Sequence, residues 1–132
     1  MRYAGFTLIE TVIFIIVLSI ALTPLSIMLV NIAQQNIYSQ AYSTAIALAE
    51  GEMERILNIP FSSISSETQT AFTSPFGVYR RQAIVDYVNP TDLNTAVAGP
   101  TSYKRIRLLV DSSTNILSGR TIELMSLATN TR

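Results

Sequence analysis

The front of the chain is almost uniformly apolar, whereas apolar and polar positions alternate in the rear. Residues 11–30 form a run of 20 residues without a charge. As an α-helix this run is about 30 Å long, which matches the hydrocarbon thickness of a bilayer. The pattern predicts a helix that can span a membrane.

The helical pattern continues past this run to Asn58, where Ile59-Pro60 stops it. From Phe6 to Asn58 the predicted helix has 53 residues, or roughly 80 Å, a length that suggests a stalk. An apolar stripe on its polar second half is expected to pack against the rear of the chain. This stripe consists of Ile37, Ala41, Ala45, Leu48 and Ile56.

Two poor helix formers lie inside the predicted helix. Pro24 removes the hydrogen bond to the Ile20 carbonyl and is expected to bend or loosen the helix. The hydroxyls of Thr23 and Ser26 are candidates to satisfy the freed backbone groups. Gly51 costs roughly 1 kcal/mol relative to alanine, and either close strand packing or a tolerated defect explains it.

Three rear segments have the alternation typical of strands: Val78 to Val88, Tyr103 to Val110 and Thr121 to Leu127. The Ser/Thr-rich segment from Ser62 to Ser74 is expected to be a loop, and residues 89–100 and 111–119 to be the two connections. The 74 residues after Asn58 are too few for a core of their own. The predicted fold class is therefore α+β, a long helix packed against an antiparallel sheet of about three strands.

Charge is distributed as unevenly as hydrophobicity. Residues 1–49 carry only Arg2 and Glu10, and the other 16 of the 18 charged residues lie at Glu50 or later. By the positive-inside rule, Arg2 places the N-terminus in the cytoplasm and the rear part outside. The net charge of zero gives no global electrostatic case for nucleic-acid binding.

Reactive side chains are few. The chain has no cysteine and no histidine, which excludes disulfides, thiolate chemistry and the usual general base. Lys104 is the single lysine, and no spacing favours a Ser-Lys or Asp-Asp pair. We predict a protein that is not an enzyme and has no cofactor.

Glu10 is the residue that a plain membrane anchor does not require. On insertion scales, an acidic side chain deep in a membrane helix costs roughly 2.5 to 3.5 kcal/mol, so it calls for a partner or a purpose. A secretory signal peptide is disfavoured, because the apolar run is too long and no A-x-A site follows it.

The string Gly5-Phe6-Thr7-Leu8-Ile9-Glu10, preceded by a short basic leader and followed by the apolar run, resembles the N-terminus of type IV pilins and type II secretion pseudopilins. The resemblance implies that a prepilin peptidase cleaves between Gly5 and Phe6 and methylates the new amine of Phe6. It also implies that Glu10 pairs with the N-terminus of an adjacent subunit. The alternative is that lipid headgroups solvate Glu10.

The resemblance further implies a pilin fold in four segments. These are a leader peptide (1–5), a transmembrane and filament-core helix (6–30), the soluble half of the helix (31–58) and the C-terminal sheet with its loops (59–132), which forms one head with 31–58. Around Pro24, family members melt locally in filaments, and a static kink is the alternative. The expected location is the bacterial inner membrane, N-in and C-out, and then a periplasmic or cell-surface filament. The expected partners are other subunits, prepilin peptidase, the assembly platform and membrane lipid.

A low-copy subunit, either a minor pilin or a minor pseudopilin, is favoured over the major one. The segment 45–57 places Glu50, Glu52 and Glu54 near Arg55, is expected to be a wet face, and is similar to the corresponding region of minor subunits. The disulfide loop of many type IV pilins is absent. The N-terminal signal is shared by pili, secretion pseudopili and DNA-uptake machines, so it does not distinguish between these three machines.

The alternative function is a membrane-anchored, extracytoplasmic binding module, with DNA as a conceivable ligand. Its candidate contacts are Arg80, Arg81, Lys104, Arg105 and Arg107. Protection of strand edges explains these cations equally well. Asp86 and Asp92, with Asn89 and Asn94, offer oxygen ligands for Ca²⁺, although turn formation explains them better.

Overall fold

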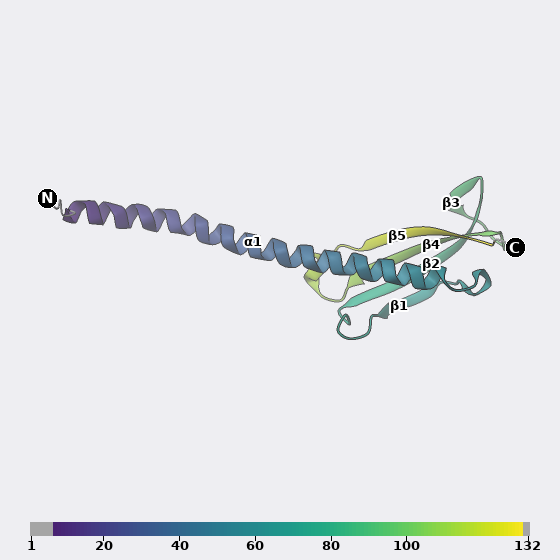
Figure 1. The fold of residues 1–132 in the computed structure, drawn as a ribbon. Helices are drawn as coiled ribbons and strands as arrows, with labels where there is room; N and C mark the ends of the chain where they lie inside the picture. Colours follow the sequence, from purple (N-terminus) through teal and green to yellow (C-terminus); the bar gives the residue numbers. More distant parts are fainter. Residues whose placement is uncertain (1–6, 131–132) are drawn as a thin grey trace, which may run out of the picture. The chain divides into compact units, whose positions relative to one another are not determined.

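A long helix precedes an antiparallel sheet in the computed structural model, which describes residues 7–130 (Figure 1). The chain divides into two compact units, Met1–Ile37 and Tyr38–Arg132, and the second is called the head below. The helix is α1 (Leu8–Leu57), and two short 3-10 helices are η1 (Phe61–Ser63) and η2 (Asn115–Leu117). The strands are β1 (Glu67–Ala71), β2 (Tyr79–Asn89), β3 (Asp92–Ala96), β4 (Tyr103–Ser112) and β5 (Ile122–Thr129).

The helix begins and ends close to the predicted limits. At its start, the Glu10 N–H donates to Thr7 Oγ1 at 3.4 Å, so that Thr7 is the N-cap. At its end, the Asn58 N–H still donates to the Glu54 carbonyl at 3.0 Å. Pro60 follows and has no N–H with which to continue the helix.

Pro24 lies inside α1, and the helix is continuous through it. The neighbouring hydroxyls bond to carbonyls other than the expected one. Thr23 Oγ1 donates to the Ser19 carbonyl at 3.5 Å, and Ser26 Oγ donates to the Leu22 carbonyl at 2.9 Å. Both side chains therefore bond back one turn within the helix, as Ser and Thr do in membrane helices, and the carbonyl of Ile20 is not their acceptor.

The sheet has the order β1-β2-β4-β5, and β3 pairs with β2 away from this path. All four pairings are antiparallel. The three predicted strands correspond to β2, β4 and β5, which confirms the α+β fold class. Along β4 the buried and half-buried residues alternate, so one face of the strand points to the core.

Two strands were not predicted. β1 lies within the segment expected to be a loop, and β3 lies within the first connection. The residues of β3 are all exposed, and those of β1 are exposed except for half-buried Glu67. Because neither strand buries an apolar face, neither carries the period-two alternation that identifies a strand in a sequence. The five-stranded sheet thus replaces the expected three.

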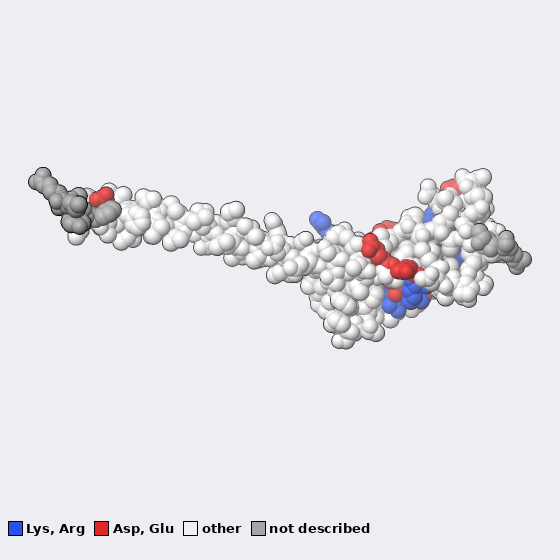
Figure 2. Space-filling view, viewed as in Figure 1, with Lys and Arg blue, Asp and Glu red and all other residues white. Residues whose placement is uncertain are grey.

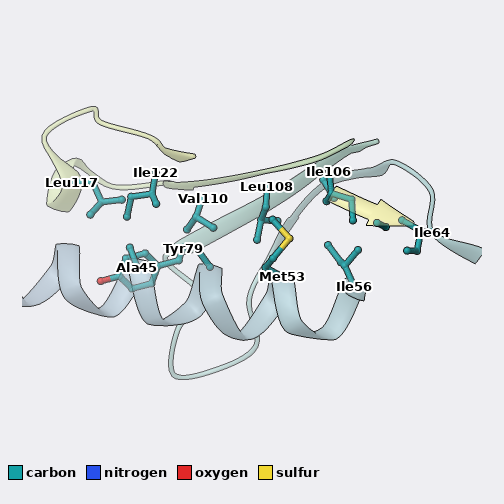
Figure 3. Close-up of a cluster of buried hydrophobic side chains, with 13 residues drawn as sticks. Ala45, Met53, Ile56, Ile64, Tyr79, Ile106, Leu108, Val110, Leu117 and Ile122 are labelled. Carbon is teal, nitrogen blue, oxygen red and sulfur yellow. The ribbon is translucent and has the colours of Figure 1, made fainter. Parts of the chain in front are cut away.

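The core of the head lies between α1 and the sheet, and Figure 3 shows apolar side chains of both pointing toward one another. Of the predicted stripe, Ala45 and Ile56 are buried, while Ala41 and Leu48 are partly buried against the core. Ile37 is 61% exposed and lies in the first unit. Further members of the cluster are Ala49 and Met53 of α1, Ile64 after η1 and Leu117 of η2. The sheet supplies the others: Tyr79, Ala83, Ile106, Leu108, Val110, Ile122 and Ala128.

Small and aromatic residues lie where the helix meets the sheet. Ala45 and Ala49 are fully buried in the core cluster. The hydroxyl of Tyr79 reaches the helix and donates to the Ala41 carbonyl at 3.2 Å. Gly51 has no such role, because it is exposed and a Cβ at this position would meet nothing within 4 Å. Close strand packing therefore does not explain Gly51.

Candidate functional site

The first turn of α1 holds Glu10 at the third helical position. Thr7 is the N-cap, and Thr7-Leu8-Ile9-Glu10 has the spacing of a capping box, in which a Ser or Thr cap precedes Glu or Gln by three residues. The Thr7 carbonyl also accepts the Thr11 N–H at 3.2 Å and the Thr11 hydroxyl at 3.3 Å. The sequence pattern T-x-x-E could have revealed this role of Thr7.

The negative charge of Glu10 is not explained by capping. Glutamine fills the same position of a capping box, so the cap needs an oxygen acceptor but no charge. The side chain of Glu10 is exposed, and none of the basic residues in the described range 7–130 forms an ion pair with it. The helix N-terminus favours an acidic residue by only about 0.3 to 1 kcal/mol. The carboxylate is therefore free to bind a cation that the described chain does not supply.

Between Glu10 and Val30, the surface of α1 is apolar on all sides rather than on one. Large apolar side chains from Leu8 to Val30 are all exposed, and Figure 2 shows this surface without charge except for acidic atoms beside the N-terminal end. A helix that is apolar all round needs apolar surroundings. Consistently, α1 contains a segment of mean hydropathy 2.7 that is long and apolar enough to cross a membrane.

The two predicted processing residues, Gly5 and Phe6, lie outside the described residues. Pro24, the other predicted assembly residue, lies within the apolar surface and 14 residues beyond Glu10. The structure thus brings Glu10 and the exposed apolar helix together on one element. It places the acidic group at the beginning of that helix.

Glu52 was expected on a wet face, and this expectation was wrong. Its side chain is only 6% exposed, and its Oε1 lies 2.7 Å from Arg55 Nη2 and 3.0 Å from Arg81 Nε. Arg55 Nη2 also lies 2.6 Å from Glu67 Oε1. Hydrogen bonds from Arg55 to Glu52, and secondly to Glu67, raise the pKa of Arg55 above its ordinary value. The cluster ties the end of α1 to β1 and β2.

The predicted basic residues lie on neighbouring strands but on both faces of the sheet. Arg81 and Lys104 are at helix-facing positions, and Arg80, Arg105 and Arg107 are at alternate positions on the outer face. On that outer face, Arg105 lies 3.0 Å and Arg107 lies 3.7 Å from the same Oδ2 of Asp86. The five cations therefore form no single patch, and their charge is partly neutralised.

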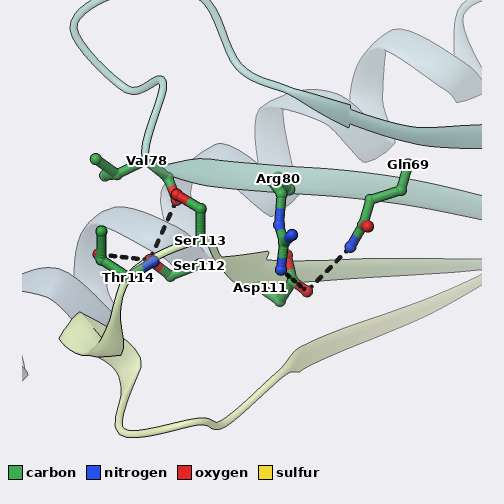
Figure 4. A network of polar contacts seen from close by, with 7 residues as sticks. All are labelled: Gln69, Val78, Arg80, Asp111, Ser112, Ser113 and Thr114. Atoms are coloured by element: carbon green, nitrogen blue, oxygen red, sulfur yellow. Dashed lines mark hydrogen bonds and ion pairs between the residues drawn. The ribbon is translucent and has the colours of Figure 1, made fainter.

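Arg80 is held in a polar network at the end of the sheet (Figure 4). Its Nε and Nη2 donate to Asp111 Oδ1 and Oδ2 at 3.0 and 2.9 Å, a two-bond contact between guanidinium and carboxylate. Gln69 Nε2 donates to the same carboxylate at 3.0 Å and thereby links β1 to β4. Asp111 thus accepts three hydrogen bonds and fixes the position of Arg80.

Lys104 is buried, and its ammonium serves the backbone. Nζ donates to the carbonyls of Phe61 and Ile64 at 2.8 and 2.6 Å, and it lies 4.7 Å from the centre of the Phe61 ring. These carbonyls belong to the segment that follows α1. The side chain therefore fastens this segment to β4.

We expect Lys104→Met to lower the free energy of unfolding of the head by about 1 to 3 kcal/mol, because two carbonyl groups lose their donor inside the protein. Calorimetry of the full chain in detergent measures this effect. Arg107→Met is the matched control, since its ion pair is 3.7 Å long and 35% of its side chain is exposed; a change within about 0.5 kcal/mol is expected. Equal melting temperatures for wild type and Lys104→Met would refute this role.

The two candidate calcium ligands have other partners. Asp86 faces Arg105 and Arg107, whereas Asp92 Oδ1 accepts the Asn94 N–H at 2.9 Å. Hydrogen bonds from the Thr95 side chain and from Asn94 lower the pKa of Asp92. Within residues 7–130, no group of three or more His, Cys, Asp and Glu side chains is placed to hold a metal ion.

Comparison with known proteins identifies one segment. Residues 1–26 match the family model of the prokaryotic N-terminal methylation motif. No curated protein and no solved structure matches the chain. The match includes Glu10, Pro24 and the apolar run between them.

Proposed function

The chain carries the N-terminal methylation motif of the type IV pilin and pseudopilin family, and from this premise we propose that it is a minor subunit of a type IV pilus or a type II secretion pseudopilus. The motif supports a structural role rather than an enzymatic one. The observation that carries the proposal is the exposed Glu10 carboxylate at the beginning of a helix that is apolar all round.

The apolar helix serves in two environments. In the membrane, lipid covers the exposed side chains from Leu8 to Val30. In a filament, the same side chains contact the helices of other subunits. The change of surroundings has a small cost, because lipid tails and neighbouring apolar side chains are similar solvents for this surface. Subunits in the membrane can therefore assemble into a filament without a large loss of favourable apolar contacts.

The Glu10 carboxylate sets the register between subunits. Cleavage after Gly5 leaves a charged amine on Phe6, and a buried carboxylate without a cation is strongly disfavoured. A neighbouring subunit's Phe6 amine is the cation that meets this need once helices pack together. Since only one axial offset brings the two charges into contact, the pair selects that offset.

The head selects the neighbours, and its features support the low-copy assignment. Glu50 and Glu54 are exposed charges on α1, and the segment 45–57 that contains them is similar in sequence pattern to the corresponding region of minor subunits. The chain has no cysteine with which to close the disulfide loop of many type IV pilins. Arg2 before the apolar run directs the N-terminus to the cytoplasm and the head to the outside.

The test is the intact mass of the full chain after co-expression with a prepilin peptidase. We expect loss of residues 1–5 and the gain of one methyl group on Phe6. An inactive variant of the peptidase is the control, and it should leave the chain whole. A chain that stays uncut beside the active enzyme would overturn the proposal and favour the membrane-anchored binding module.

A further inference from the structure

The exposed side of α1 in the head contains a glycine that the chain itself does not need. Gly51 weakens the helix by roughly 1 kcal/mol relative to alanine, yet a Cβ at this position would meet open space. Ala47 lies one turn earlier on the same side and is also exposed. A smooth strip of helix backbone is therefore open to close approach by another molecule.

Two carboxylates flank this strip. Glu50 and Glu54 are exposed and lie one turn apart, a spacing at which like charges repel. Neither forms an ion pair within residues 7–130, unlike Glu52 between them. Figure 2 shows acidic atoms in a row over α1. This face, called the acidic strip, consists of Ala47, Glu50, Gly51 and Glu54.

A second surface of the head has the complementary character. A hollow of about 390 Å³ lies between α1 and the segment that connects β4 to β5. Tyr38 and Tyr42 line it from the helix and are 46% and 42% exposed, and Ser118 and Arg120 line it from the connecting segment. Arg120 is exposed and is in no ion pair among the described residues.

We propose that the acidic strip of one copy of this chain docks into the Tyr38–Tyr42–Arg120 hollow of a second copy. The Arg120 guanidinium then lies between the Glu50 and Glu54 carboxylates, and it relieves their mutual repulsion. The rings of Tyr38 and Tyr42 pack on the strip, where Gly51 and Ala47 present no side chain that would hold them off. The repulsion between Glu50 and Glu54 on the strip is thus matched by Arg120 in the hollow. The exposed Gly51 is matched by the two tyrosine rings.

The contact joins two different surfaces, so it is repeatable. The strip and the hollow share no residue, which leaves the strip of the second copy free to bind a third. The centres of their helical residues are separated by about 10 positions, or roughly 15 Å along α1. Copies that dock in this way are therefore offset along the helix, and the series is no longer than the number of copies of a low-copy subunit. The inference rests on the proposed function, and it adds head-to-head pairing to the pairing at Glu10.

Cysteine cross-linking of the full chain in membranes tests the contact, because the chain contains no cysteine of its own. One copy carries Ala47→Cys at the N-terminal end of the acidic strip, and the other carries Ser118→Cys at the hollow; neither change removes a charge. With a short bismaleimide, we expect a dimer when the two variants are co-expressed. Either variant expressed alone should give only background, because each surface meets the other surface rather than itself.

Charge reversal then separates a specific ion pair from mere proximity. Arg120→Glu in the Ser118→Cys copy should lower the dimer yield about fivefold or more. Glu50→Arg with Glu54→Arg in the Ala47→Cys copy should restore the yield when the two reversed copies are combined. The inference would be overturned if the dimer yield stayed at background in every combination, or if charge reversal did not change it.

The intact mass of the same samples separates this inference from the proposed function. Cleaved and methylated chains that give no cross-link refute the contact and leave the subunit assignment standing. If Arg120→Glu instead reduces sedimentation of the full chain with phosphatidylglycerol vesicles and no cross-link forms, the hollow binds a lipid headgroup and the inference is overturned.

Discussion

Replacing Glu10 with glutamine is expected to abolish incorporation of the subunit into filaments while cleavage after Gly5 continues. Glutamine preserves the acceptor that a capping box requires, so the first turn of α1 stays intact. It removes the charge that we propose to pair with the neighbouring Phe6 amine, and an unpaired buried charge costs about 3 to 5 kcal/mol. Incorporation should fall by more than about a hundredfold, measured as tagged subunit in sheared filaments from the native host.

Thr7→Ala is the matched control, because it removes the cap and keeps the charge. Loss of an N-cap side chain weakens the helix by about 1 kcal/mol, which the long helix can absorb in a membrane. We expect incorporation within about twofold of wild type. Wild-type incorporation of Glu10→Gln would show that Glu10 serves only as a capping residue.

The second large effect is expected from Glu52→Ala, which should lower the free energy of unfolding of the head by about 3 kcal/mol. The carboxylate is 6% exposed and contacts both Arg55 and Arg81. Its removal leaves Arg81, which is only 28% exposed, beside the core without its counter-charge. The melting temperature of the full chain in detergent should fall by more than about 10 °C, as measured by calorimetry.

Glu54→Ala provides the control for helix propensity and charge. It makes the same substitution two residues later, at an exposed position without an ion pair among the described residues. A change within about 0.5 kcal/mol is expected. Combining Glu52→Ala with Arg81→Ala should cost less than the sum of the single changes, because the two side chains interact directly. Similar melting temperatures for Glu52→Ala and Glu54→Ala would contradict the buried ion pair.

The long helix and the strands β2, β4 and β5 could be predicted because their residues repeat with the period of the element. The apolar run, Pro60 and the alternation of Ile106, Leu108 and Val110 are local signals, and β4 confirms the last of them. β1 and β3 gave no signal, because their side chains lie mostly in solvent and bury no apolar face. Their pairing with β2 depends on backbone hydrogen bonds that any sequence can make.

The buried charges could not be predicted for a different reason. A glutamate or lysine is expected in solvent unless a partner is known. The partners of Glu52 and Lys104 come from segments far along the chain, Arg81 in β2 and the Phe61 carbonyl after α1. Such pairs exist only once the helix lies on the sheet. By contrast, the motif that contains Glu10 could be recognised in the sequence because it is contiguous, and residues 1–26 match the family model of the prokaryotic N-terminal methylation motif.

The core of the head joins segments made early and late in synthesis. Ala45 and Ile56 belong to α1, whereas Ile122 and Ala128 belong to β5, close to the C-terminus. Contacts between segments so far apart in sequence form late and slowly. The apolar side of Tyr38–Leu57 is therefore exposed to solvent until β5 has been synthesised and has packed into the core. A chaperone that binds this helical side would protect the chain in the interval before its head folds.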